Sequence, residues 1–192
     1  MLWIAPMIVC VVLVLAIAAW VGSVRFNSLC LARDLCKEAL RQLGAVCRER
    51  HVVVSSVVCV LRENGRAADA DALAAVLARA ERARRAAVDG PCTAECAQEL
   101  SAAESALSNT LVALLGEGSG TRAEAPAAGF VPQLGALEVR LAAAARYYNH
   151  SVHAYSSRRN RPLSFVFRAH FPVMPVLRYR SAGALIVIGA HT

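Results

Sequence analysis

The chain has 192 residues, of which 57% are hydrophobic, and its net charge is +7. That length suits one domain of ordinary size beside a hydrophobic segment. Its seven cysteines are odd in number and lie mostly within helical patterns, which argues against a secreted disulfide framework. Thirteen basic and fourteen acidic side chains precede Arg140, whereas eight arginines and no acidic residue follow Glu138. This asymmetry predicts an anionic partner for the C-terminal end.

The N-terminal segment, residues 2–24, contains no charged side chain. At about 1.5 Å per residue, a helix of this length covers roughly 30 Å, enough to cross the core of a bilayer. Trp3 and Trp20 lie near its two ends, where amphipathic rings prefer the two lipid–water boundaries. The segment predicts a transmembrane anchor over residues 1–24.

Three other interpretations of this segment are weaker. A cleaved signal peptide would begin with basic residues, but the first basic residue is Arg25, and the apolar run continues past the Ala16-Ile17-Ala18 site. A lipoprotein would modify Cys10, but the bulky Val9 precedes it. A buried helix of a soluble core is seldom apolar over such a length. The pattern therefore favours an anchor that stays on the mature chain.

The flanks of the anchor predict its orientation. Arg25, Arg33, Lys37 and Arg41 follow the run and no basic residue precedes it. Because positive charges near a span stay in the cytoplasm, we expect a single-pass plasma-membrane protein with a short N-terminus outside and a cytoplasmic body.

One long amphipathic helix is predicted to continue the anchor as far as Glu63. Residues 25–63 contain no proline and only one glycine, Gly44. Asn64-Gly65 is a helix stop signal. The β-branched run 52–58 is assigned to the helix because no turn residues precede it. Apolar residues recur at steps of three and four, with an interruption near Arg50: Leu29, Ala32, Cys36, Ala39, Leu43, Val46, Val53, Val57 and Leu61.

Three further helices are predicted, over about 69–88, 93–115 and from 134 toward Pro162, with a loop over 116–129. In the last helix Leu134, Leu141, Tyr148 and Tyr155 repeat every seven residues, as in a coiled coil. Leu137 or Glu138, Ala145 and Val152 fill the intermediate positions. We therefore expect an all-α protein, in which the anchor continues into an antiparallel up-down bundle of about four helices over 25–161. A basic, aromatic, irregular tail follows over 162–192.

Two segments are similar to the LemA family. Phe26-Asn27-Ser28-Leu29 follows the anchor, and residues 145–155 read Ala-Arg-Tyr-Tyr-Asn-His-Ser-Val-His-Ala-Tyr. LemA proteins carry a Tyr-Asn-Ser-Leu-like segment after the anchor and Ala-Arg-x-x-Tyr-Asn-x-x-Val-x-x-Tyr-Asn, followed by Phe-Pro, near the end. Here Ser156 replaces the second Asn, and Phe-Pro is replaced by Arg161-Pro162 or displaced to Phe171-Pro172. Leu177-Arg178-Tyr179-Arg180 replaces the family's Tyr-Phe-Glu-like end. The resemblance implies a divergent member, a helical bundle with an outside N-terminus, and no established biochemical activity.

Motifs for catalysis or ligand binding are not found in the sequence. It contains no glycine-rich phosphate loop, no HExxH and no nucleophile elbow. We expect no catalytic residue, cofactor or metal site. The pairs Cys92/Cys96 and Cys47/His51 are interpreted as buried small side chains, and His150/His153 as exposed helix residues, rather than as metal ligands. The candidate interaction residues come from the family-like segments and the basic end: Asn27, Tyr148, Asn149, Val152, Tyr155, Arg158, Arg159 and Arg161.

These observations predict a non-catalytic interaction or scaffold module at the cell envelope. The alternative is an accessory subunit of an envelope enzyme or transporter, or an enzyme with an unrecognised site. Expected partners are membrane lipids around the anchor, anionic lipid at the basic tail, and a membrane or cytoplasmic protein. Three chain reversals would return the tail to the membrane side, where Arg side chains meet anionic headgroups. Nucleic acid is not expected, because it would require a basic groove or stacking platform.

Overall fold

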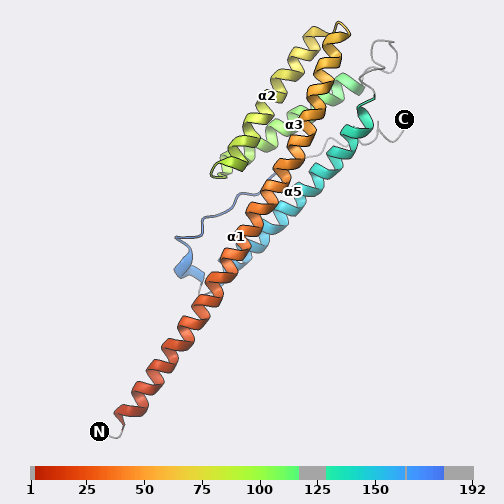
Figure 1. Cartoon of the computed structure of the whole chain (residues 1–192). Helices are drawn as coiled ribbons and strands as arrows, with labels where there is room; N and C mark the ends of the chain where they lie inside the picture. Colours follow the sequence, from red (N-terminus) through yellow and green to blue (C-terminus); the bar gives the residue numbers. More distant parts are fainter. Residues whose placement is uncertain (1–2, 117–128, 163, 180–192) are drawn as a thin grey trace.

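The computed structural model describes residues 3–116, 129–162 and 164–179, and these ranges contain four α-helices and no strand. The helices are α1 (Ile4–Glu63), α2 (Ala67–Asp89), α3 (Ala94–Gly116) and α5 (Val131–Arg159), followed by a 3-10 turn, η1 (Ser164–Phe167). The all-α, up-down architecture expected from the sequence is confirmed (Figure 1). Most of the predicted loop, residues 117–128, lies outside the described residues.

Helix α1 joins the apolar segment to the bundle without a break over 60 residues. At about 1.5 Å per residue it is roughly 90 Å long. The β-branched run 52–58 is helical, as expected. The helix ends where Gly65 takes a φ of 78°, and the amide of Arg66 then donates to the carbonyl of Leu61 at 2.9 Å. Glycine adopts this left-handed conformation without strain, so Asn64-Gly65 stops the helix and reverses the chain.

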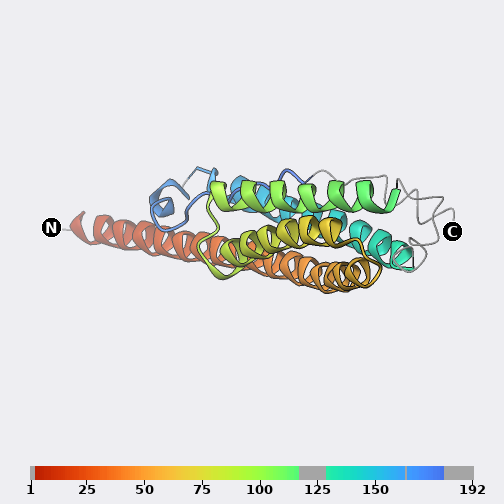
Figure 2. The same cartoon turned by 90° about the horizontal axis from the view of Figure 1, so that it is seen from above.

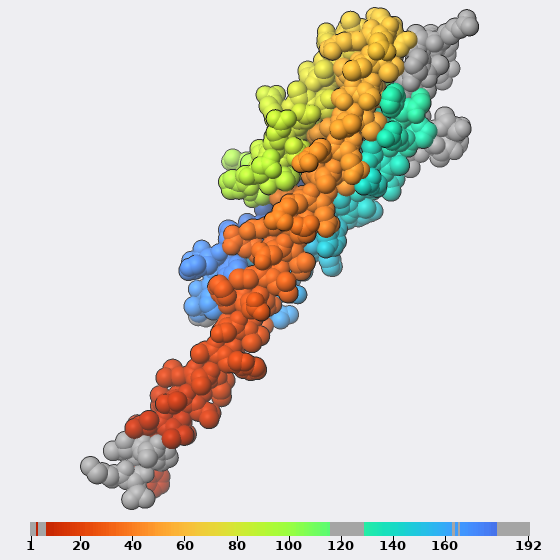
Figure 3. Space-filling view, in the orientation of Figure 1, coloured from red at the N-terminus to blue at the C-terminus, as the bar shows by residue number. Residues whose placement is uncertain are grey.

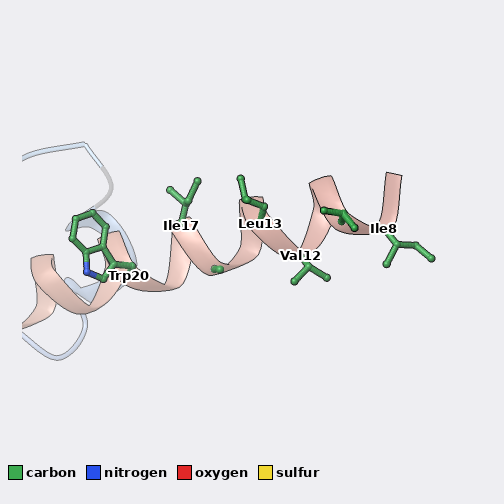
Figure 4. A pocket seen from close by; sticks show the side chains of 7 residues that line it. Ile8, Val12, Leu13, Ile17 and Trp20 are labelled. Atoms are coloured by element: carbon green, nitrogen blue, oxygen red, sulfur yellow. The ribbon is translucent and has the colours of Figure 1, made fainter. Parts of the chain in front are cut away.

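The first part of α1 extends beyond the bundle (Figures 1 and 3). Its apolar side chains are exposed from Met7 to Trp20, with Trp3 88% and Trp20 71% exposed. The labelled side chains of Figure 4, from Ile8 to Trp20, line a shallow apolar surface on this single helix. By length and composition, α1 is able to cross a membrane.

The bundle is built along the remainder of α1. Helix α2 runs back against α1, α3 packs on α2, and α5 lies along α1 (Figure 2). Gly44 allows the close approach of α1 and α2, because a Cβ added there would lie 2.6 Å from Cγ2 of Val88. The hydroxyl of Thr93 opens α3 by accepting a hydrogen bond from the amide of Cys96 at 3.2 Å, which is the N-capping role expected of threonine.

The seven-residue pattern of α5 faces the core, as expected. Leu134, Leu141, Tyr148 and Tyr155 are each no more than 1% exposed. The core also includes Phe171 and Leu177 from the segment after η1. The described part of the C-terminal tail is therefore not a loose extension, because it contributes to the same core as the four helices.

The buried stripe of α5 makes a first prediction. Leu141→Ala should lower the free energy of unfolding of the detergent-solubilised protein by about 2–5 kcal/mol, because it leaves a cavity in the core. Val139→Ala, on the exposed face of the same helix, should change it by less than about 0.5 kcal/mol. Urea denaturation followed by circular dichroism measures both. Equal losses in the two variants would contradict the assigned register.

Candidate functional site

The most specific arrangement of polar groups is a groove between α3 and α5 that holds the extended segment 171–179. The segment follows η1 and runs back along the bundle, away from the apolar end of α1 (Figure 1). From the α3 side, the hydroxyl of Ser101 donates to the carbonyl of Arg178 at 2.6 Å. We call this region the tail groove.

The α5 side of the tail groove is formed by residues predicted from the sequence as candidates for interaction. Tyr148, Asn149, Tyr155 and Arg159 all bond to the main chain of the segment, so they recognise an extended backbone rather than particular side chains. The donors and acceptors are Tyr155 Oη to Pro172 O at 2.7 Å, Tyr148 Oη to Pro175 O at 2.9 Å, Arg159 Nε to Phe171 O at 2.7 Å, Asn149 Nδ2 to Leu177 O at 2.8 Å, and the Leu177 amide to Asn149 Oδ1 at 2.9 Å.

The spacing of the two tyrosines matches that of the two prolines. Seven residues separate Tyr148 from Tyr155, which is about 10 Å along a helix axis. Three residues separate Pro172 from Pro175, which is also about 10 Å in an extended chain. Proline favours this extended backbone, and it has no amide hydrogen that would need a partner in the groove. The two repeats therefore place each tyrosine hydroxyl opposite a carbonyl.

The other expected interaction residues have different surroundings. Val152 is buried in the core beneath the groove. Arg158 reaches α1, where its Nη1 donates to the carbonyl of Ser28 at 3.3 Å. Asn27 and Arg161 are exposed. The structure thus brings Tyr148, Asn149, Tyr155 and Arg159 together, but it does not add Asn27 or Arg161 to the groove.

The histidine and cysteine pairs also differ in burial. His150 and His153 are exposed, as expected, and Cys92 and Cys96 are partly buried. Across the described ranges, no group of three or more His, Cys, Asp or Glu side chains has the arrangement of a metal site.

A buried charged cluster lies at the far end of the tail groove. Arg50 on α1 is fully buried, and its Nη1 and Nη2 lie 2.9 Å from Glu104 on α3 and 3.2 Å from Glu138 on α5. His51 Nε2 lies 2.8 Å from the second oxygen of Glu104. Tyr179, at the end of the described tail, donates to Glu138 at 2.5 Å. One guanidinium therefore links α1, α3, α5 and, through Glu138, the tail.

Burial also affects the pKa of neutral groups in the cluster and in the tail groove. Burial raises the pKa of the Tyr179 hydroxyl, and its hydrogen bond to Glu138 acts in the same direction. Burial likewise raises the pKa of the Tyr148 hydroxyl, with a further contribution from Cys92. Burial and the nearby Glu104 raise the pKa of the Cys47 thiol. Both tyrosines therefore remain protonated donors at neutral pH.

Little open space lies on the side of the cluster that faces Cys47 and Tyr179. The cavity bounded by Cys47, Glu104 and Tyr179 has a volume of about 10 Å³, which is roughly the room that one water molecule needs. In this arrangement the two carboxylates face a guanidinium, a hydroxyl and an imidazole. The cluster as it stands connects helices.

Sequence reasoning missed this cluster, although a signal was present. Arg50 interrupts the apolar pattern of α1, Glu138 occupies an intermediate position of the seven-residue pattern, and Glu104 lies between Leu100 and Leu107 on the buried face of α3. A charged residue on an apolar stripe must find a partner when the helix packs. Three such residues with opposite charges therefore indicated a buried ion pair.

Comparison of the chain with models of known protein families, with characterised proteins and with solved structures finds no match.

The tail groove makes a second prediction. Asn149→Ala removes both hydrogen bonds to Leu177 and should cost about 1–3 kcal/mol of stability. It should also speed amide hydrogen exchange over residues 171–179, because the Leu177 amide loses its acceptor. His150→Ala, the exposed neighbour on α5, is the control and should leave exchange there unchanged. Slow exchange of the segment in Asn149→Ala would contradict the role of this side chain.

The charged cluster makes a third prediction. Arg50→Met leaves Glu104 and Glu138 buried without their cation and should lower the free energy of unfolding by about 3–5 kcal/mol. Arg48→Met, at an exposed position of the same helix, should cost less than about 0.5 kcal/mol. Adding Glu104→Gln and Glu138→Gln to Arg50→Met should recover part of the loss, which denaturant titration would measure. A loss in Arg50→Met as small as that in Arg48→Met would disprove the charge pairing.

Proposed function

We propose that this chain is a membrane-anchored helical-bundle protein of the LemA type, with an interaction or scaffold role at the cell envelope. The observation that carries this proposal is the continuity of α1. One helix bears an exposed apolar segment from Met7 to Trp20 and, further along, the core face of the bundle. Exposing so much apolar surface to water is unfavourable, and a bilayer removes that cost.

The orientation proposed is an outside N-terminus with a cytoplasmic body. Basic residues follow the apolar segment at Arg25, Arg33 and Lys37, and such residues favour the cytoplasmic side. All seven cysteines are free thiols, as is usual for proteins of the reducing cytoplasm. Both observations support a body inside the cell at the plasma membrane.

The basic end is proposed to contact anionic lipid. The ring of Phe26 lies 5.5 Å from those of Phe167 and Phe171, and Arg158 bonds to Ser28. The end of α5 and η1 therefore lie beside the part of α1 that leaves the apolar segment. Exposed Arg161 and Arg168 belong to this region. Each arginine near an anionic surface contributes roughly 1 kcal/mol.

Not every arginine of the tail takes part in this contact. The carbonyl of Arg178 bonds to Ser101 on α3, so this residue lies along the bundle and away from the anchor end. The tail begins at the membrane side and then runs back along the bundle. The three chain reversals predicted from the sequence did not include this further turn. Arg180 lies outside the described residues.

The tail groove is occupied by the chain's own tail, which limits the surfaces that a protein partner could bind. In the LemA-like segment, Tyr148, Asn149 and Tyr155 already bond the chain's own tail. A partner protein is therefore proposed to use another surface. Leu31 and Leu35, which lie one helical turn apart on α1 and are 59% and 45% exposed, form an apolar strip close to the anchor. Such a strip suits a neighbouring membrane protein.

The fourth prediction tests the anchor and its orientation with a reporter fused after Thr192. The fused protein should remain in the membrane fraction after alkaline extraction, with the reporter active in the cytoplasm. Leu13→Arg combined with Ile17→Arg should move it out of that fraction, because each arginine costs about 2.5–3.5 kcal/mol near the centre of a span. Leu31→Arg with Leu35→Arg, the same spacing on the bundle part of α1, is the control and should stay membrane-bound.

Two outcomes would count against the proposal. Membrane retention unaffected by arginines at 13 and 17 would show that the apolar segment is not the anchor. Activity of an export-dependent reporter at the C-terminus would show that the orientation is the opposite of the proposed one.

Photocrosslinking from Leu31 and Leu35 in cells then identifies the protein partner.

A further inference from the structure

A recess between α1 and α2 has the features of an anion-binding site. It has a volume of about 280 Å³ and is lined by Arg48, His51, Val52, Ser55, Glu81, Arg84 and Arg85. That volume lies just below the usual range for drug-sized ligands, so it suits a small molecule. The recess is separate from the tail groove, although His51 connects it to the buried charged cluster. We call it the α1–α2 recess.

Arg84 is the central residue of the recess. It lies on the buried stripe of α2, which also contains Ala70, Leu73, Leu77, Ala80 and Ala87. Its side chain is therefore directed toward α1 rather than toward solvent, and the residue is 7% exposed. Nε and Nη1 of Arg84 are buried and have no hydrogen-bond partner among the described residues. A buried guanidinium without an acceptor is costly, so an acceptor from outside the chain would be strongly favoured.

His51, which also lines the recess, has another buried nitrogen without a partner in the described part of the chain. It is 3% exposed, its Nε2 bonds to Glu104 at 2.8 Å, and its Nδ1 has no partner within the described ranges. The carboxylate of Glu104 occupies Nε2 of the ring, so Nδ1 is the ring nitrogen that the described residues leave without a partner. The recess therefore adjoins two buried side chains, Arg84 and His51, whose polar groups are incompletely bonded within this part of the chain.

The charges around the recess favour a negative ligand. Arg48, Arg84 and Arg85 contribute three positive charges, and Glu81 is the one acidic side chain of the lining. Glu81 is paired with Arg85 at 3.2 Å, so these two charges offset each other and the lining keeps the positive charges of Arg48 and Arg84. We propose that the α1–α2 recess binds a small oxyanion of the phosphate class, held by the guanidinium of Arg84 next to His51.

The position of the recess identifies the source of this anion. His51 lies 27 residues beyond Val24 on the same helix, which is about 40 Å from the end of the apolar segment. A lipid headgroup does not reach that far, and the surface field of a membrane decays within about 10 Å at 0.1 M salt. The ligand is therefore a soluble phosphate or phosphomonoester. This choice of a soluble source rests on the proposed membrane anchor, whereas the phosphate chemistry of the recess does not.

The fifth prediction tests the recess by adding inorganic phosphate to the full detergent-solubilised chain. Phosphate should raise the unfolding temperature above that in chloride of equal ionic strength, because a ligand of the folded state stabilises it. Arg84→Met should remove this rise or weaken the apparent Kd at least about tenfold. Arg82→Met, at an exposed position of α2, is the matched control and should keep the wild-type response. Sulfate should raise the unfolding temperature in the same way as phosphate, and acetate should raise it less.

A second measurement needs no variant. Phosphate should shift the ring-nitrogen NMR resonances of His51 in the wild-type chain and leave those of the exposed His150 and His153 unchanged. This measurement tests anion binding in the recess even if Arg84→Met does not fold. Equal thermal responses in Arg84→Met and wild type, or an unmoved His51 resonance at saturating phosphate, would overturn the proposal. An effect that appears only with anionic vesicles would assign the recess to lipid instead.

Discussion

The buried guanidinium of Arg50 constrains the whole bundle. A charge with no exposure to solvent must be neutralised within the protein, and the two carboxylates that do so come from α3 and α5. Each ion pair fixes how far its helix slides along α1. Tyr179 then bonds to Glu138, which ties the end of the described tail to the same point. Apolar packing alone tolerates small shifts of register, whereas this arrangement of charges does not.

The tail groove provides hydrogen-bond partners for the main chain of an irregular segment that packs against the core. Main-chain groups inside a protein need hydrogen-bond partners, and an isolated extended segment has none from its own backbone. Here α5 provides them through Tyr148, Asn149, Tyr155 and Arg159, and α3 adds Ser101. The tail lies between α3 and α5 and covers the sides of these helices that face each other. The polar residues of α5 from Tyr148 to Arg159 thus have a structural role in this chain.

The length of α1 gives the molecule two separate ends. One end carries the apolar segment, the aromatic contacts of Phe26 and the exposed arginines after α5. The other end carries the α1–α2 recess, with Arg84 and His51. A single continuous helix connects them, so the recess is held at a fixed distance from the anchor. If both proposals hold, a soluble anion would bind on the body of a protein that is fixed to a membrane.

Local features of the sequence determined most of the fold. The uncharged run 2–24, the stop at Asn64-Gly65 and the seven-residue pattern from Leu134 to Tyr155 gave the helices and their buried faces, because periodicity and turn residues act over a few positions. Tertiary structure alone decided which groups meet. Arg50 pairs with residues 54 and 88 positions away, Asn149 bonds to a segment that has no regular pattern, and Arg84 lies on an apolar stripe facing a recess. A buried polar side chain shows in the sequence that it needs a partner, but the partner itself depends on how distant helices pack.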